Sequence, residues 1–327
     1  MSIRSALAAL LVLLLAAAVH ADVGLPPSDG PIQVRVMVVV LDVDNVDAVA
    51  QSFITNAYFE ARWFDARLAY DLPEQRVLPL DSVWNPRLLF VNQQRITYTL
   101  PQVVHVSPEG EVAYRQHIWG PFSQPLDVHE FPFDTQSFDL LITPAGYELG
   151  EVALIQDPER PSGISPSFSV ADWLVTGFAA AGETYSFVPG APIPAFRMSL
   201  QAKRQSAYFL LKLILPAILI VGMACTVFWL DPSNASTQIG VTTTSMLTLM
   251  AYRFILAGFV PPVPYLTRMD AFVLGATAIV FLILIVAVST TFLATRGRVA
   301  RALSIELHCR WTFPLAFLSL SLYTLAF

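Results

Sequence analysis

Residues 207–230 read AYFLLKLILPAILIVGMACTVFWL, a stretch in which Lys212 is the only charged side chain. At about 1.5 Å of rise per residue, a helix of this length crosses about 30 Å of hydrocarbon. Three further apolar stretches follow, at residues 236–258, 271–294 and roughly 303–327. We therefore predict that residues 206–327 form a bundle of four transmembrane helices.

The charge of the chain is divided at the start of this bundle. Residues 22–205 carry 22 acidic and 11 basic side chains, whereas residues 206–327 carry three acidic and seven basic ones. We expect residues 22–205 to be a separate domain in water. Its negative excess excludes a role in binding nucleic acid, because phosphates require a basic surface.

The N-terminus predicts export of this domain. Residues 1–21 contain Arg4 as the only basic residue, an apolar run over 6–19 and a small-residue cleavage site ending at Ala21, as secretory signals do. Four arginines lie between residues 296 and 310, opposed only by Glu306, so the positive-inside rule puts that connection in the cytoplasm. With four spans, the N-terminal domain and the C-terminus both face the outside.

Residues 22–205 have the pattern of an all-β, immunoglobulin-like sandwich. Short β-rich runs alternate with clusters of Pro, Gly, Asn and Asp, at 34–41, 53–63, 86–91, 102–106, 136–143, 166–178 and 194–202. The only cysteines, Cys225 and Cys309, lie in the apolar half, so this domain can hold no disulfide. The scattered histidines predict no metal site, and no catalytic motif or cofactor-binding motif supports an enzyme.

The second apolar stretch differs from the others because hydroxyl side chains occupy its middle. Helical steps of four and three residues align one stripe, Gly240, Thr244, Leu247, Ala251, Phe254 and Gly258. This stripe is suited to line a pore. The alternative is that the hydroxyls bond to backbone carbonyls or to neighbouring helices. A pore also requires several copies of the chain, because four helices enclose no wide aqueous path.

Several short motifs, in this order and spacing, resemble those of pentameric ligand-gated ion channels, the Cys-loop receptor superfamily. They are WFDARL at 63–68, WNP at 84–86, FPFDTQ at 131–136, LP at 215–216, TTSMLT at 243–248 and PY at 264–265. The positions that would close the eponymous disulfide hold Gln124 and Phe138. This departure and the short connection before the fourth helix resemble the prokaryotic branch, which implies a bacterial inner membrane with the β domain in the periplasm.

The resemblance implies a homopentamer in which the second helices surround a central pore. The stripe then lines the pore, Leu247 is its hydrophobic gate, and Ser236 and Thr237 stand at its cytoplasmic mouth, where cation-selective relatives usually carry glutamate. No charged side chain at the mouth therefore determines whether cations or anions pass. The acidic β domain favours cations.

The agonist, by resemblance, binds between subunits in an aromatic cage. The candidates are Tyr58, Tyr147, Tyr185, Phe187 and Phe196, of which the last three flank a hairpin at residues 188–194. For Tyr58 and Phe196, ordinary sandwich core is the alternative interpretation. A small molecule or protons remain open as the agonist, since exposed acids and His105, His117 or His129 provide titratable groups.

Coupling between the two halves is expected at their junction, by the same resemblance. The residues concerned are Asp44, Asp47, Pro132, Phe133, Asp134, Arg204, Pro261, Pro264 and Tyr265. The rival function is a non-conducting membrane sensor whose β domain binds a periplasmic ligand. Both functions require no cofactor, and their partners are other copies of the chain, the lipid bilayer and, for the channel, inorganic ions.

Overall fold

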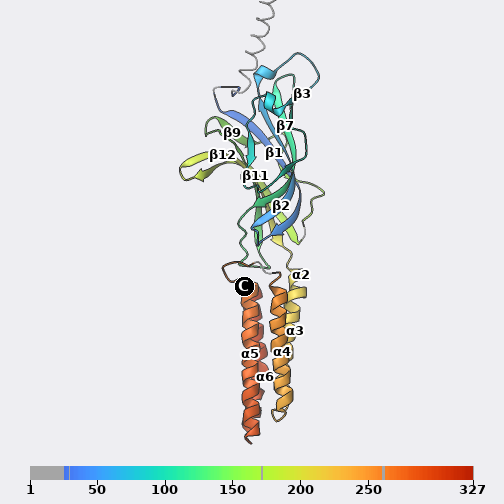
Figure 1. Cartoon of the computed structure of the whole chain (residues 1–327), viewed down its shortest axis with the longest axis vertical. Coiled ribbons are helices and arrows are strands. Elements are labelled where there is room, and N and C mark those ends of the chain that lie inside the picture. Colours follow the sequence, from blue (N-terminus) through green and yellow to red (C-terminus); the bar gives the residue numbers. More distant parts are fainter. Residues whose placement is uncertain (1–25, 29, 171, 260–261, 327) are drawn as a thin grey trace, which may run out of the picture. The chain divides into compact units, whose positions relative to one another are not determined.

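The computed structural model describes residues 26–28, 30–170, 172–259 and 262–326 (Figure 1). The expected signal sequence at residues 1–21 lies outside the described residues. Two compact units are present. The first contains the chain up to Pro125 together with residues 137–170 and 175–202, and the second contains residues 126–136, 172–174 and the chain from Lys203 onward. The second unit thus takes in the FPFDTQ motif from the middle of the sequence.

The larger sheet of the first unit is built around three long antiparallel strands, β1 (Ile32–Asp47), β2 (Ser52–Phe64) and β7 (Glu111–Ser123). Its strand order is β10-β1-β2-β7-β6-β3, with β9 also paired to β1 and β5 to β7. The short strands of this sheet are β3 (Arg76–Pro79), β5 (Thr97–Tyr98), β6 (Val103–Val106), β9 (Val152–Gln156) and β10 (Gly163–Ile164). Two 3₁₀ turns, η1 (Ala66–Leu68) and η2 (Leu80–Ser82), lie between strands.

The second sheet has the order β11-β12-β8-β4, with β11 (Trp173–Val188), β12 (Ala191–Arg204), β8 (Thr135–Pro144) and β4 (Leu88–Phe90). Alternate residues of β1 are buried, as a sheet with one covered face requires, whereas residues 59–63 of β2 are buried on both faces. Their buried side chains form a core with those of the second sheet, which includes Trp63, Phe59, Phe138, Leu140 and Phe196. The predicted β-sandwich is therefore present.

Two differences from the predicted strands have a physical cause. Strand β7 was not predicted, because Arg115, Gln116 and His117 interrupt its apolar alternation; Gln116 is nevertheless fully buried, and its amide donates to the carbonyls of Leu100 and Pro101. The strand expected at 166–178 begins only at Trp173, because a turn between Ser165 and Phe168 precedes it.

Gln124 and Phe138 occupy the two positions at which the family's disulfide would be formed. Gln124 makes hydrogen bonds to the strand that carries Phe138. Its amide nitrogen donates to the carbonyl of Ser137, and its amide oxygen accepts from the N–H of Asp139 at 2.8 Å. The ring of Phe138 is buried and packs on Phe53, with centroids 5.2 Å apart. Two hydrogen bonds thus connect the segments that a disulfide would join, and the Phe138 ring is held in the core by β2.

The second unit is helical after Arg204. It contains α2 (Ala207–Phe209), a π-helical segment η3 (Leu210–Ile214), α3 (Leu215–Cys225), a 3₁₀ turn η4 (Thr226–Trp229), α4 (Ala235–Leu256), α5 (Arg268–Thr295) and α6 (Val299–Ala326). Among the described residues, three helical stretches are long and apolar enough to cross a membrane, namely Ala207–Trp229, Ala235–Leu256 and Arg268–Thr295. The first half of α6 carries Arg301, Glu306, His308 and Arg310, so a fourth span stays a prediction.

The π-helical segment has its cause in Pro216. In an α-helix, the N–H at position 216 would bind the carbonyl of Lys212, but proline has no N–H and its ring displaces that carbonyl. The hydroxyl of Tyr252 on α4 donates to this carbonyl at 3.2 Å and to that of Leu213 at 2.8 Å. The helix distortion is thereby tied to α4.

Tyr252→Phe should destabilise the helical unit, because it removes the hydroxyl that donates to the carbonyls of Lys212 and Leu213. In an apolar surrounding, water does not take the place of this donor. The loss of one such bond corresponds to about 1 kcal/mol. We expect a lower midpoint of thermal unfolding for the purified protein in detergent. Tyr208→Phe is the matched control, since Tyr208 is 40% exposed. An unchanged midpoint for Tyr252→Phe would contradict the role assigned to its hydroxyl.

Candidate functional site

Helix α4 has one face against the other helices and one face that the single chain leaves open. Gln238, Thr242, Ser245, Leu249 and Leu256 are buried, at the spacing of one helix face. The opposite face is exposed, with Leu247 at 65% and Phe254 at 83%. All residues of the predicted stripe are exposed: Gly240, Thr244, Leu247, Ala251, Phe254 and Gly258, the last of which lies just beyond the end of α4.

Some hydroxyl groups of α4 are buried against other helices, and others lie on the exposed face that is predicted to line the pore. Thr242 and Ser245 are buried and donate to the carbonyls of Gln238 and Val241 at 2.9 and 2.8 Å, as the packing interpretation expects. Thr244 lies instead on the exposed face, and its carbonyl accepts from the hydroxyl of Thr248 at 2.8 Å. The open face is therefore polar near its beginning and apolar further on.

The start of α4 is capped by Asn234, whose side chain accepts from the N–H of Thr237 at 3.4 Å and from the hydroxyl of Ser236 at 3.2 Å. Ser236 and Thr237 are both exposed. The predicted pore mouth thus consists of neutral hydroxyl side chains.

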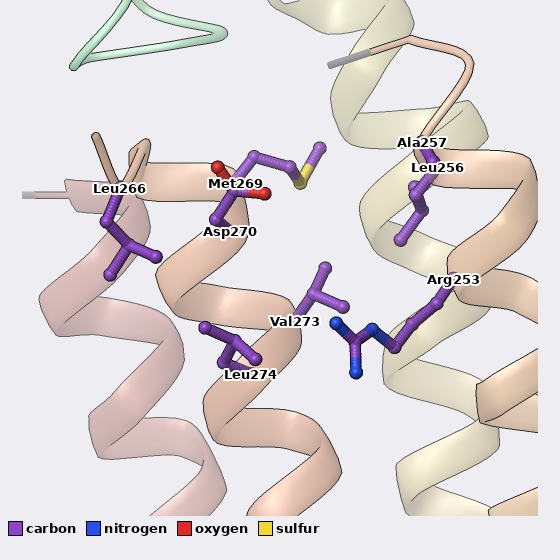
Figure 2. A pocket seen from close by; sticks show the side chains of 8 residues that line it. All are labelled: Arg253, Leu256, Ala257, Leu266, Met269, Asp270, Val273 and Leu274. Carbon is purple, nitrogen blue, oxygen red and sulfur yellow. The ribbon is translucent and has the colours of Figure 1, made fainter. Parts of the chain in front are cut away.

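The single charged residue of α4, Arg253, has no role in the sequence-based predictions. Figure 2 shows its guanidinium reaching from α4 toward α5. It lines a cavity of about 180 Å³ between these helices, and Asp270 stands on the other side. The carboxylate of Asp270 accepts from the hydroxyl of Thr267 at 2.7 Å in a capping box. Arg253 could be identified from the sequence only as a charge beside the stripe.

Arg204 and Asp134, both predicted to act in coupling, form a bidentate ion pair. The Nε and Nη2 atoms of Arg204 donate to the two carboxylate oxygens of Asp134 at 2.7 and 3.0 Å. The side chains are only 11% and 2% exposed. The amide of Gln136 also donates to Asp134 at 2.8 Å. Removal of either charge would leave the other buried without its partner.

Aromatic rings surround the Arg204 guanidinium. Its central carbon lies 4.2 Å from the ring centre of Trp173, 5.0 Å from that of Phe131 and 5.9 Å from that of Phe209. Cation–π attraction of this kind is stronger where water is excluded. Arg204 therefore connects the loop 126–136, the start of β11 and the start of the first transmembrane helix within the second unit.

The loop 126–136 makes a second set of contacts, with the segment between α4 and α5. The ring of Tyr265 stacks on His129 with centroids 3.7 Å apart, and its oxygen accepts from the N–H of Val128 at 3.1 Å. Arg268 donates to Glu130 at 2.6 Å, and its N–H donates to the carbonyl of His129 at 2.9 Å. The predicted Tyr265 is thus in contact with the loop, whereas His129, Glu130 and Arg268 were not predicted to act there.

The remaining coupling candidates have different surroundings. Pro132 is buried and Phe133 half-buried in the loop, Pro264 is exposed, and Pro261 lies outside the described residues. Asp44 and Asp47 belong to the first unit. The first accepts from the indole N–H of Trp119 at 2.7 Å, and the second accepts from the N–H groups of Val49 and Ala50. Their coupling role stays a prediction.

Asp127, which precedes His129 in the loop, has a lowered pKa. The N–H of His129 donates to its carboxylate at 3.0 Å, and the ring of His129 bonds to the same oxygen at 2.6 Å. Because these bonds favour the ionised form, the stability that they contribute is present above the ordinary pKa of aspartate and is lost as the pH falls through the lowered value.

Tyr58, a predicted ligand-binding residue, is half-buried on β2 and stands opposite His117 of β7. Its pKa is raised by burial and by the negative charge of Glu60. The nearby arginines lower this pKa and so offset part of the increase. Tyr58 therefore lies beside a charged cluster and outside the fully buried sandwich core.

That charged cluster consists of Glu60 with three arginines. Glu60 is 3% exposed and lies 2.7 Å from Arg62, 3.3 Å from Arg115 and 3.1 Å from Arg160. Burial alone would raise the pKa of Glu60, but the hydrogen bond from Arg62 and the three positive charges lower it overall. The stability of this cluster is therefore present above the ordinary pKa of glutamate and lost as the pH falls through the lowered value.

The other predicted ligand-binding aromatics are found in separate places. Tyr147 packs edge-on against Trp84 at 5.8 Å, and Tyr185 packs edge-on against Phe187 at 5.2 Å near the β11–β12 turn. Phe187 is 57% exposed. Phe196 is fully buried, which favours the sandwich-core interpretation, and we leave it out of the site. Among the described rings, no contact joins Tyr58 to Tyr147 or to Tyr185.

Comparison with known proteins agrees with these features. The family model described as the neurotransmitter-gated ion-channel ligand binding domain matches residues 17–187, and that of the transmembrane region of the same family matches residues 213–304. A relative from Gloeobacter violaceus named as a proton-gated ion channel is 25% identical over 298 residues, covering 90% of this chain and 82% of the relative.

A second relative, the gamma-aminobutyric acid receptor subunit beta-4 of Gallus gallus, is 25% identical over 280 residues, which cover 81% of this chain and 56% of the relative. The chain thus spans little more than half the length of that subunit. The ligand-binding model alone covers more than half of the present chain, and the transmembrane model follows it in the same order. The chain belongs to the neurotransmitter-gated ion-channel family and is a multi-pass membrane protein.

Proposed function

We propose that this ligand-gated ion channel is a homopentamer of a bacterial inner membrane, with its β-sandwich and C-terminus in the periplasm and four helices per subunit in the bilayer. The observation that supports a pore is the exposed face of α4. In one chain, the stripe from Gly240 to Gly258 is exposed, although the opposite face is buried. Copies arranged around an axis would turn these stripes toward a common channel.

Within this pore, a ring of Leu247 forms the gate. Its side chain is 65% exposed and follows Thr244 by one helical turn. A narrow apolar ring closes a pore by excluding water, without the need for physical contact across it. Thr244 and the hydroxyls at the mouth would contact hydrated ions on one side of this ring.

We further propose cation selectivity. Residues 22–205 carry 22 acidic against 11 basic side chains, so an entrance surrounded by several copies attracts cations. The mouth residues Ser236 and Thr237 are neutral. The positive charge of Arg253 would repel cations, but its side chain is directed toward α5 (Figure 2).

The agonist, in this proposal, acts on the β-sandwich between two subunits. One side of the site is the surface around Tyr58, and the other consists of Tyr147, Tyr185 and Phe187, which are not in ring contact with Tyr58 in a single chain. A small molecule with a cationic group suits aromatic rings. Protons are the second candidate, favoured by the named activity of the relative from Gloeobacter violaceus.

Current recordings from the purified protein in planar bilayers test the proposal. We expect current that depends on pH, between about pH 4 and pH 9, or on an added amine, with a reversal potential in asymmetric salt that indicates cations. Confirmed pentamers that pass no current under any condition would support the alternative function, a non-conducting sensor. A reversal potential for anions would contradict the proposed selectivity alone.

Leu247→Ser should make the channel easier to open, because a polar side chain lowers the barrier to wetting the ring. We expect leak current, or a half-activating agonist concentration about tenfold lower, which corresponds to about 1.4 kcal/mol. The same change at Leu219 on α3, which is 64% exposed, provides the control because it lies off the stripe. If Leu247→Ser conducts as the wild type does, this residue is not the gate.

Arg204→Ala should reduce agonist-evoked current while pentamers still form, because it leaves Asp134 buried without its partner. Breaking a buried pair costs about 3–5 kcal/mol. Arg204→Lys retains the charge but loses the bidentate geometry, so an intermediate current is expected. Assembly is measured by light scattering after size exclusion. Normal currents from Arg204→Ala pentamers would remove Arg204 from the mechanism.

A further inference from the structure

A carboxyl group is buried among the transmembrane helices, away from the stripe and from the coupling loop. Glu306 lies in α6 and is 1% exposed in the single chain. Its Oε1 atom accepts a hydrogen bond from the amide of Gln238 at 2.8 Å. Its Oε2 atom is also buried but has no hydrogen-bond partner among the described residues.

Gln238 connects Glu306 to the other helices. It is fully buried in the first turn of α4, and its amide nitrogen also lies 3.3 Å from the carbonyl of Leu230, at the end of η4. Its amide oxygen accepts from the hydroxyl of Thr291 on α5 at 3.1 Å. This Gln238 junction, formed by Gln238, Glu306, Thr291 and the Leu230 carbonyl, thus joins α4, α5, α6 and the turn before α4.

Glu306 has no ion-pair partner among the described residues. Within the described residues, no arginine, lysine or histidine side chain lies within 4.0 Å of its oxygens, and Arg310, one turn further along α6, donates to the carbonyl of Phe228 instead. The other charged or titratable groups on these elements and their connections are Cys225 on α3, Asp231 in the turn before α4, Tyr252 and Arg253 on α4, Arg268 and Asp270 on α5, Arg296 and Arg298 between α5 and α6, and Arg301, His308, Cys309 and Tyr323 on α6. Elements α3, η4 and the first turn of α4 place no charged side chain against it.

Two states of such a group are physically acceptable. A neutral carboxylic acid can stay buried with its carbonyl oxygen bonded to Gln238. An ionised carboxylate without a cation costs several kcal/mol to bury, so it requires water or a rearranged junction. A glutamine at position 306 would also accept a hydrogen bond from Gln238, so this bond alone does not require an acid. Glutamate differs from glutamine in that it can release a proton.

We propose that Glu306 is a proton-binding site within the transmembrane helices. When the proton is bound as Oε2–H, the Gln238 junction stays closed and dry; when the O–H bond breaks and the proton passes to water, the junction hydrates and the contact between α6 and the first turn of α4 loosens. Because that turn begins the helix with the open stripe, the occupancy of this site biases the pore. The last step rests on the proposed channel function, whereas proton binding does not.

Infrared difference spectroscopy of the full-length protein in lipid tests proton binding directly. We expect a carboxylic-acid carbonyl band that exchanges for a carboxylate band as the pH is raised, at one group per chain, and that is missing in Glu306→Gln. Asp231→Asn is the matched control, because Asp231 is an exposed acid in the nearby α3–α4 turn. Identical titrating bands in wild type and Glu306→Gln would overturn the proposal, as would a Glu306 band that does not titrate.

A second variant keeps the test valid if Glu306→Gln does not assemble. Gln238→Met removes the donor to Glu306 but retains the acid. Since a hydrogen bond stabilises the carboxylate more than the neutral acid, we expect the titration midpoint to rise by about one pH unit. An unchanged midpoint would overturn the assigned contact between Gln238 and the titrating group.

Current recordings separate this inference from the proposed function. If the wild type conducts, changing the pH only on the side of the α3–α4 turn should alter its current, and Glu306→Gln should abolish that response while responding normally to pH on the other side. A retained response overturns the coupling of this site to the pore. If the wild type passes no current, the channel proposal fails, and the infrared titration still decides proton binding.

Discussion

Polar groups that are removed from water must find partners within the protein, and among the described residues of the helical unit only the Oε2 atom of Glu306 is a buried side-chain polar atom without one. Pro216 disturbs the first long helix, and Tyr252 of α4 binds the carbonyls beside the distortion. Thr242 and Ser245 bind carbonyls of their own helix. The buried face of α4 is therefore held by specific hydrogen bonds as well as by apolar packing, which leaves its opposite face free for another role.

The same constraint explains the loop 126–136. Asp134 is almost fully buried, and it is compatible with burial because Arg204 binds both its oxygens and three rings cover the guanidinium. On its other side, the loop binds Tyr265 and Arg268 next to α5. One loop from the middle of the sequence therefore contacts both the beginning of the first membrane helix and the connection between α4 and α5.

Features that repeat along the chain could be predicted from the sequence, and features that depend on a distant partner could not. The strand at β1, the apolar helices and the alignment of the α4 stripe follow from composition and spacing, whereas the choice between pore and packing for that stripe relied on the family resemblance. Strand β7 was not predicted because the polar Gln116 interrupts its apolar alternation, and the carbonyls that accept from the buried amide nitrogen of Gln116 lie outside the strand. Likewise, a glutamate in α6 and a glutamine in α4 become a site only when folding brings them together. Phe196 illustrates the reverse case, an aromatic whose burial is decided by the opposite sheet.

Gln124 has a consequence for how the protein is made. In its place, a pair of cysteines would need an oxidant and could be joined to the wrong partners. The two hydrogen bonds from Gln124 to the backbone around Phe138 form as soon as the segments meet, and they break and re-form without any chemical reaction. With both cysteines of the chain free, the β-sandwich can mature without oxidative folding enzymes, and reducing agents should leave it intact.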